Sequence, residues 1–183
     1  MAGGRPPAWG WYRLDPAWAD RLVADSGVRQ GDLVLDIGAG DGALTAPLLE
    51  RGARVIAVEL HPGRAAALRK RFGADIKVVQ VDAGDLRLPR RPFHVVANPP
   101  WAITDALLKR LLHPASLLVR ADLLLKRSST RRWVDAATAN GHRLRAGPTV
   151  PRRAFRPSPP TDGRVLVIEP TADRRRPRDK MRW

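Results

Sequence analysis

Short, largely apolar runs alternate along this chain with stretches of helical periodicity, and this alternation limits the possible fold more than any other feature. Four runs are expected to be strands covered on both faces: Leu33–Gly38, Val55–Leu60, Ile76–Asp82 and His94–Asn98. Helical spacing occupies Ala43–Arg51, Pro62–Phe72 and Thr104–Leu112, and three later strands are expected at Leu117–Ala121, Arg143–Val150 and Arg164–Glu169. Because alternating strands and helices require crossover connections, the sequence predicts an α/β fold with a mostly parallel, seven-stranded sheet and helices on both faces.

The length of 183 residues fits one domain with short appendages. We expect a flexible segment over residues 1–8, a catalytic domain over residues 9–170 and a basic tail over residues 171–183. The chain has no cysteine and its four histidines lack the spacing of metal ligands, so we expect no metal site. No apolar run is long enough to span a membrane and no signal peptide is recognisable, which predicts a cytoplasmic protein without a membrane partner.

Basic residues dominate the charge of the chain, with 33 Lys and Arg against 18 Asp and Glu, a net charge of +15. Residues 120–183 hold 17 of the basic residues and 6 of the acidic ones. Such a charge favours a polyanionic partner, although a coding bias toward arginine and alanine is an alternative cause. The arginines that we expect to contact this partner are Arg127, Arg131, Arg132, Arg152 and Arg153.

A glycine-rich turn follows the first buried strand, in the segment Asp36-Ile-Gly-Ala-Gly-Asp-Gly42. Its spacing is G-x-G-x-G, because Ala43 stands where the dinucleotide motif has its last glycine. Glycines at this place let a ligand approach the backbone and the start of the next helix closely. Alone, such a turn is as easily structural as functional.

Acidic residues end the next two strands and make the glycine turn more specific. Glu59 lies 19 positions after Gly40, where a carboxylate reaches ribose hydroxyls, and Asp82 with Ala83 is placed for an adenine. The carboxylates near the turn would repel a pyrophosphate. The sequence therefore predicts a nucleoside cofactor without phosphates, and the cationic S-adenosylmethionine fits this description.

The fourth strand leads into the tetrad Asn98-Pro-Pro-Trp101. The exocyclic amine of adenine is a poor nucleophile, because its lone pair is delocalised into the ring. Acceptors at the Asn98 side chain and the Pro99 carbonyl would draw this nitrogen toward tetrahedral geometry, so that positioning replaces a strong base. Trp101 would stack on a base extruded from its helix. A tight turn with a core tryptophan is the alternative interpretation.

Taken together, these segments resemble the rRNA adenine-N6 methyltransferases, and within them the erythromycin-resistance (Erm) branch. The resemblance rests on VLDIGAGDGALT (34–45), VIAVEL (55–60), VVQVDA (78–83), VVANPPW (95–101) and PRRAFRPSPPTDGRVLVIE (151–169), and it covers roughly residues 9–169. It implies a Rossmann-like class I fold and S-adenosylmethionine-dependent N6-methylation of an adenine in 23S rRNA. We expect the chain to be a monomer. In that family the modification blocks macrolides, lincosamides and streptogramin B.

The resemblance also implies roles for individual residues. Gly38 and Gly40 would flank the methionine part of the cofactor, Glu59 would contact the ribose, and Asp82 and Ala83 the adenine. Ala39 and Leu60 would also bind the cofactor. Asn98 would touch both cofactor and target, Pro99 and Trp101 the target base, and Phe155 would close over that base. Tyr12 and Leu14 would complete the cofactor site.

The chain departs from the family pattern at two places. The family's amino-terminal motif begins with Gln, whereas the corresponding residues here are Trp11-Tyr12-Arg13-Leu14. A sizeable helical carboxy-terminal domain is also expected in the family, while this sequence stops soon after the last predicted strand, as in short actinobacterial Erm-like proteins. Two alternatives stay open: methylation of adenine in small-subunit rRNA or DNA, and a non-catalytic RNA-binding factor on the same scaffold.

Overall fold

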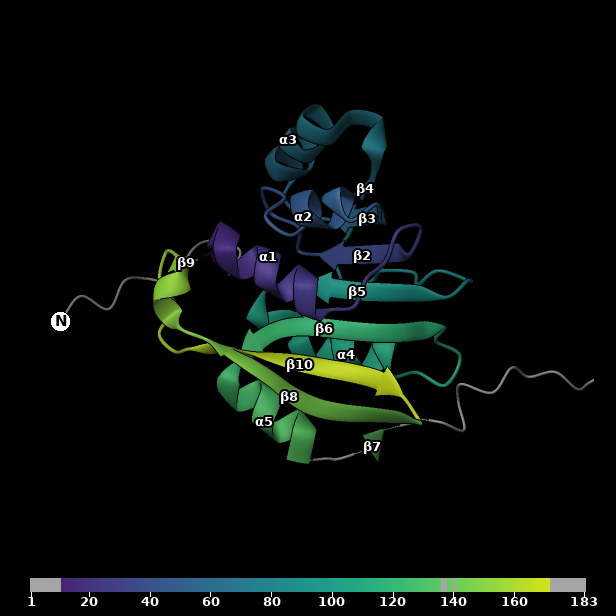
Figure 1. Ribbon diagram of the computed structural model, residues 1–183, viewed down its shortest axis with the longest axis vertical. Helices are drawn as coiled ribbons and strands as arrows, with labels where there is room; N and C mark the ends of the chain where they lie inside the picture. The colour runs from purple at the N-terminus through teal and green to yellow at the C-terminus, as the bar shows by residue number, and fades with distance from the viewer. Residues whose placement is uncertain (1–10, 136–137, 140, 172–183) are drawn as a thin grey trace, which may run out of the picture.

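One twisted sheet runs through the molecule and carries helices on both of its faces (Figure 1). The computed structural model describes residues 11–135, 138–139 and 141–171. The order of the strands in the sheet is β4-β3-β2-β5-β6-β10-β8-β7. Their bounds are β2 Leu33–Ile37, β3 Arg54–Val58, β4 Ile76–Val79, β5 Phe93–Ala97, β6 Leu118–Lys126, β7 Thr138–Ala139, β8 His142–Val150 and β10 Gly163–Pro170.

The sheet is mostly parallel, as the sequence predicts. Neighbouring strands from β4 to β6 pair in parallel, and β10 lies antiparallel between β6 and β8. All seven predicted strands are present, and the eighth, β7, adds only two residues at the β8 edge. The fifth predicted strand is longer than expected, because β6 continues beyond Ala121 to pair with β10 from Gly163 to Ile168.

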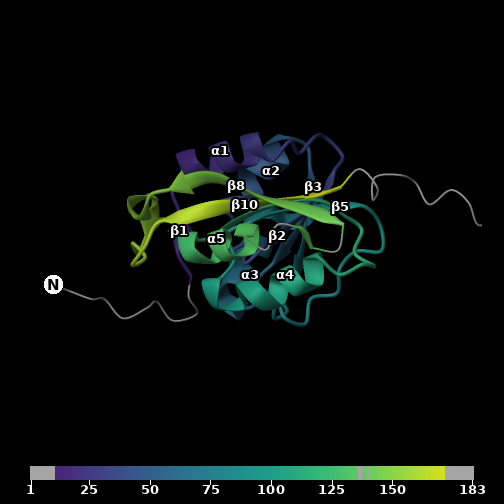
Figure 2. The ribbon, with the colours of Figure 1, turned by 90° about the horizontal axis from the view of Figure 1, so that it is seen from below.

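The helices divide between the two faces of the sheet according to the alternation of strand side chains. Val34 on β2 packs in the cluster that contains α1, α2 and α3, whereas Leu33 and Leu35 face the cluster of α4. Figure 2 shows α1 and α2 on one side of the sheet with α4 and α5 on the other. The helices are α1 Pro16–Asp25, α2 Thr45–Glu50, α3 Pro62–Phe72, α4 Thr104–Leu111 and α5 Arg127–Asp135.

Two of these helices, α1 and α5, are absent from the sequence-based expectation. Helix α1 does carry a start signal, since the Asp15 side chain accepts a hydrogen bond from the Ala17 N–H and Pro16 opens the first turn. Helix α5 is strongly polar and buries only Thr130, so it has too few apolar residues at helical spacing to be predicted from the sequence.

A separate two-stranded ribbon joins the start of the described chain to the segment between β8 and β10. Strand β1 (Arg13–Leu14) pairs antiparallel with β9 (Phe155–Arg156), and Leu14 lies opposite Phe155. This pairing brings the amino-terminal candidates for the cofactor site next to a candidate for the target site. The predicted segment 1–8, and the predicted tail beyond Thr171, lie outside the described residues.

Among the residues that the structure describes, no helix is long and apolar enough to cross a membrane. In the same part of the chain, no cluster of three or more histidine, aspartate or glutamate side chains could hold a metal ion.

Candidate active site

The glycine turn after β2 packs closely against both neighbouring strands. Gly38 and Ala39 donate backbone hydrogen bonds to the Val58 carbonyl at 2.8 and 3.1 Å. Gly38 has a φ of 77°, and a Cβ atom there would lie 2.8 Å from Cδ of Pro100. This glycine is therefore required both by its left-handed backbone and by the close approach of the Asn98–Trp101 segment.

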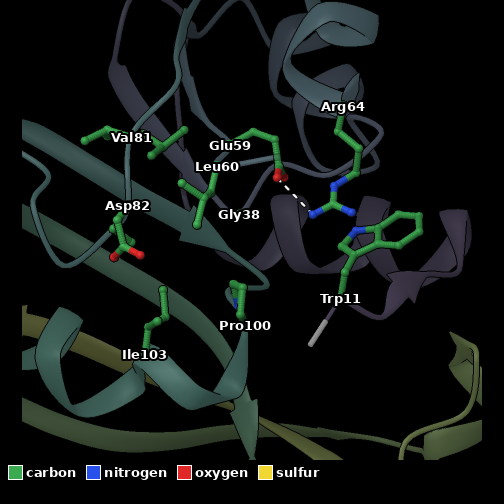
Figure 3. A pocket seen from close by; sticks show the side chains of 11 residues that line it. Trp11, Gly38, Glu59, Leu60, Arg64, Val81, Asp82, Pro100 and Ile103 are labelled. Carbon is green, nitrogen blue, oxygen red and sulfur yellow. Dashed lines mark hydrogen bonds and ion pairs between the residues drawn. The ribbon is translucent and has the colours of Figure 1, made fainter. Parts of the chain in front are cut away.

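A pocket opens at the carboxyl ends of β2, β3 and β4, where parallel sheets bind ligands (Figure 3). Five of its lining residues are predicted cofactor contacts: Gly38, Glu59, Leu60, Asp82 and Ala83. The other lining residues are not among the predicted cofactor contacts: Trp11, Val58, Arg64, Val81, Pro100 and Ile103. The structure thus gathers the ribose-side and adenine-side candidates around one cavity.

Glu59 is the most buried charged group of this pocket, with 3% of its surface exposed. One carboxylate oxygen, Oε2, accepts the Gly40 N–H at 2.9 Å. The other, Oε1, accepts the His61 N–H at 2.8 Å and Nη2 of Arg64 at 3.0 Å. Two main-chain donors therefore fix the carboxylate between the glycine turn and the start of α3.

Arg64 and Trp11 close the pocket on the side of α3. The Arg64 guanidinium lies 5.2 Å from the centre of the Trp11 ring, and Figure 3 shows both side chains beside Glu59. The Trp11 ring also fills the space next to Gly40, where a Cβ atom would collide with it. With both side chains in place, the cavity has a volume of about 50 Å³.

The opposite end of the pocket combines Asp82 with apolar walls. The Gly84 N–H donates to Oδ1 of Asp82 at 2.7 Å, which orients the carboxylate in the turn after β4. Val81 and Ile103 flank it (Figure 3). A carboxylate between apolar side chains suits the amino edge and the faces of a purine.

A second, smaller cavity beside the glycine turn gathers the remaining cofactor candidates except Gly40, which lines neither cavity. Its lining includes Tyr12, Leu14, Ala39 and Asn98 together with the buried Asp36. Burial, together with the Glu59 and Asp41 carboxylates, raises the pKa of Asp36 to about 7, although a 2.7 Å hydrogen bond from the Thr45 hydroxyl opposes the rise. Carboxylates around this turn fit a cationic ligand and oppose a phosphate.

Asn98 directly follows β5 and lines the second cavity. Its side-chain nitrogen Nδ2 donates to the Tyr12 carbonyl at 2.8 Å, which leaves Oδ1 as an acceptor. Trp101, in the short 3₁₀ helix η3 (Trp101–Ile103), lies 5.3 Å from Tyr12 between ring centres, with the planes tilted by 43°. The structure therefore brings together the amide, the diproline turn and an aromatic surface.

Phe155 lies behind this aromatic surface. Its ring meets the edge of Trp101 at 6.4 Å with an interplanar angle of 79°, and it is fully buried. Phe155 therefore supports Trp101 in this structure, and its predicted closure over a target base stays a prediction.

Of the five predicted polyanion-binding arginines, three line a common groove and two do not. Arg127, Arg131 and Arg152 line a groove between α5 and the segment before β10, where Lys126 and Arg164 join them. Arg132 instead forms an ion pair with Asp105 of α4, whose pKa is lowered by hydrogen bonds from Trp133 and Arg132. Arg153 is exposed in the 3₁₀ helix η4 (Arg152–Ala154) and does not line this groove.

The strand order, the glycine turn and the acidic ends of β3 and β4 define the class I S-adenosylmethionine-dependent methyltransferase fold. The sequence profile of the family described as ribosomal RNA adenine dimethylase matches residues 11–147. The chain belongs to this family, whose members are S-adenosylmethionine-dependent methyltransferases.

Curated relatives include both a resistance protein and small-subunit rRNA methyltransferases. The mycinamicin-resistance protein MyrB of Micromonospora griseorubida is 36% identical over 174 residues, covering 91% of this chain and 56% of the relative. Ribosomal RNA small subunit methyltransferase A of Synechococcus sp. (strain RCC307) is 36% identical over 193 residues, with 91% of this chain and 69% of the relative covered. The chain thus spans little more than half the length of MyrB.

Among solved structures, the 23S rRNA methyltransferase ErmE has a TM-score of 0.78 at 26% sequence identity. The match covers 87% of this chain and 70% of that protein. A dimethyladenosine transferase from Plasmodium falciparum has a TM-score of 0.77 at 23% identity, which shows the fold alone.

Proposed function

We propose that this chain transfers a methyl group from S-adenosylmethionine to N6 of an adenine in 23S rRNA and thereby confers resistance to macrolides, lincosamides and streptogramin B. The observation that carries the proposal is the position of Asn98, which lines the second cavity and donates to the carbonyl of Tyr12, the residue whose ring meets Trp101. Family membership supports the reaction, and the likeness to MyrB and ErmE supports the large-subunit substrate.

Asn98 and Pro99 position the nucleophile. With Nδ2 held by the Tyr12 carbonyl, Oδ1 of Asn98 accepts one N6 hydrogen, and the Pro99 carbonyl accepts the other. The nitrogen lone pair then attacks the methyl carbon, the carbon–sulfur bond breaks to leave a neutral thioether, and the N6 proton passes to solvent. The cofactor supplies an electrophilic methyl on a positively charged sulfur, so no strong base is needed.

Glu59, Asp82 and the glycine turn hold the cofactor in this proposal. Glu59 takes the ribose, Asp82 and Ala83 take the adenine, and the Gly38–Gly40 turn with Tyr12 and Leu14 takes the methionine end. Trp101 stacks on the extruded base, and Phe155 holds the Trp101 ring in place from behind.

The groove of Lys126, Arg127, Arg131, Arg152 and Arg164 anchors the RNA backbone. Its two acidic lining residues are Asp135, which pairs with Arg131 at 3.7 Å, and Asp162, which accepts the Arg152 N–H at 2.9 Å. The cations therefore outnumber the acids, as a phosphate-binding surface requires. Action on ribosomal RNA would take place in the cytoplasm, and we propose a monomer.

Small-subunit rRNA is the second candidate substrate. The Synechococcus relative, a small-subunit methyltransferase, matches this chain with the same identity as the mycinamicin-resistance protein. Naked 23S and 16S rRNA, incubated with the purified chain and tritiated S-adenosylmethionine, distinguish the two substrates. We expect label in 23S rRNA and a primer-extension stop at an adenine in cells that express the chain. Label in 16S rRNA alone would refute the large-subunit substrate, and label in neither would favour a non-catalytic RNA-binding factor.

A further inference from the structure

The carboxylate expected to hold the ribose is already occupied by a side chain of the protein itself. A carboxylate offers roughly four lone-pair sites. In Glu59 three of them are used, by the main-chain N–H groups of Gly40 and His61 and by the Arg64 guanidinium. One site remains, whereas the two hydroxyls of a ribose require two.

Of these three donors, only Arg64 can leave without unfolding its surroundings. The Gly40 N–H belongs to the glycine turn, and the His61 N–H belongs to the N-terminal cap of α3. Arg64 reaches Glu59 with the far end of a long side chain. Its Nε is buried and has no hydrogen-bond partner, so the guanidinium is incompletely satisfied where it lies.

The space in the pocket supports the same conclusion. A cavity of about 50 Å³ is too small for a nucleoside, and Arg64 stands in it with Trp11 on its other side (Figure 3). Withdrawal of the guanidinium would enlarge the cavity and free one oxygen of Glu59 at the same time. The Trp11 ring offers the displaced cation a partner that is independent of Glu59.

We propose that Arg64 competes with the ribose of the cofactor for Glu59 and thereby sets the affinity and release of the cofactor. This inference rests on the proposed function, since it requires that the pocket binds S-adenosylmethionine. Arg64 acts as an affinity-determining residue: cofactor entry breaks its ion pair with Glu59, and departure of S-adenosylhomocysteine restores it.

The test is titration calorimetry of the full chain with S-adenosylhomocysteine. Arg64→Ala should bind about three- to ten-fold more tightly than the unsubstituted protein, the range expected for the loss of one competing hydrogen bond. Arg64→Lys should bind S-adenosylhomocysteine almost as weakly as the unsubstituted protein does, because an ammonium can also pair with Glu59. Arg69→Ala removes the same charge from an exposed position of α3 and should leave the affinity unchanged.

The Arg64→Ala substitution in a Glu59→Gln protein distinguishes competition for Glu59 from a structural effect of losing Arg64. In Glu59→Gln, which lacks the charge that attracts the guanidinium, addition of Arg64→Ala should change the affinity less than two-fold. The proposal would be overturned if Arg64→Ala alone bound S-adenosylhomocysteine no more tightly than the unsubstituted protein. It would also be overturned if Arg64→Ala increased the affinity in the Glu59→Gln background as much as it does in the unsubstituted protein. Absence of binding by every form, including the unsubstituted protein, would instead refute the proposed function.

Discussion

The side-chain nitrogen of Asn98 donates a 2.8 Å hydrogen bond to the main-chain carbonyl of Tyr12, although 86 residues separate the two positions. This bond fixes the orientation of the amide and leaves its oxygen as the free acceptor. It also places a residue of the amino-terminal segment in direct contact with the diproline turn.

Asn98→Ala should lower the single-turnover rate of methyl transfer by about 10²- to 10³-fold, the usual effect of removing one preorganised polar group. Affinity for RNA and thermal stability should change little, since Asn98 lies at the end of β5 and is only partly buried. Asn98→Asp keeps an oxygen but loses the donor to Tyr12, so it should also be impaired. An unchanged rate in Asn98→Ala would contradict the proposed positioning of N6.

Glu59→Ala should weaken S-adenosylmethionine binding by about 1–3 kcal/mol, because it leaves the ribose hydroxyls without their acceptor. Calorimetry measures this change, and circular dichroism checks that the variant is folded. The direction is opposite to that expected for Arg64→Ala, although both substitutions break the same ion pair. A folded Glu59→Ala protein with unchanged affinity would remove Glu59 from the cofactor site.

Trp101→Ala should weaken binding of the target RNA by about 1–3 kcal/mol through lost stacking, and Trp101→Phe or Trp101→Tyr should recover much of it. Because Trp101 also contacts Tyr12 and Phe155, its replacement could disturb the neighbouring cofactor site. Unchanged cofactor affinity is therefore the control for a local structural effect. RNA binding that is equal in the alanine and phenylalanine variants would argue against a stacking role.

The pKa of Asp36, raised by burial to about 7, makes a pH-dependent contribution to stability. The folded protein retains the Asp36 proton over a range in which the unfolded chain, with the ordinary value of 3.8, has lost it. This contribution is complete below about pH 4 and is lost as the pH rises toward and through 7. Asp36→Asn should therefore flatten the decline in the free energy of unfolding between pH 4 and 7, measured by urea denaturation. Parallel curves for the two proteins would place the Asp36 pKa near its ordinary value.

Arg127, Arg131 and Arg152 should each contribute to the salt dependence of RNA binding, because they line one groove. Replacement of one phosphate-contacting arginine by alanine should reduce the slope of log affinity against log salt by about 0.7 to 0.9. The charge-matched control is Arg54→Ala, which removes an exposed arginine at the first residue of β3, outside the groove. Identical slopes for the control and the groove variants would show that the groove does not contact RNA.

The sheet was predictable because the parallel strands β2 to β5 are short, largely apolar runs. The seven predicted strands and their mostly parallel arrangement agree with the sequence analysis, which missed only the two-residue β7 of this sheet, and α3 begins and ends at the predicted residues. Helix α1 could have been found from Asp15 and Pro16, which are local start signals. Helix α5 could not, because its polar residues are ordered by tertiary contacts such as that of Trp133 with Asp105.

The pocket was only half predictable, for a related reason. Glu59, Asp82 and the glycine turn follow strand ends, where the topology of a parallel sheet places a site. Arg64 lies five residues beyond Glu59, on the first turn of α3, and its proximity becomes apparent only once His61 is known to cap that helix. No local signal identifies Trp11, whose position depends on the pairing of β1 with the distant β9.

That ribbon has a consequence for the order in which the site assembles. Leu14 and Phe155 stand near opposite ends of the described chain, so closing β1 onto β9 requires a loop that contains almost the whole sheet. Contacts of such long sequence separation carry the largest entropic cost and form after local ones. The aromatic surface of Tyr12 and Trp101, with Phe155 behind it, therefore exists only in the completely folded molecule, and a partly unfolded chain would keep its sheet while losing the surface on which we propose that the base stacks.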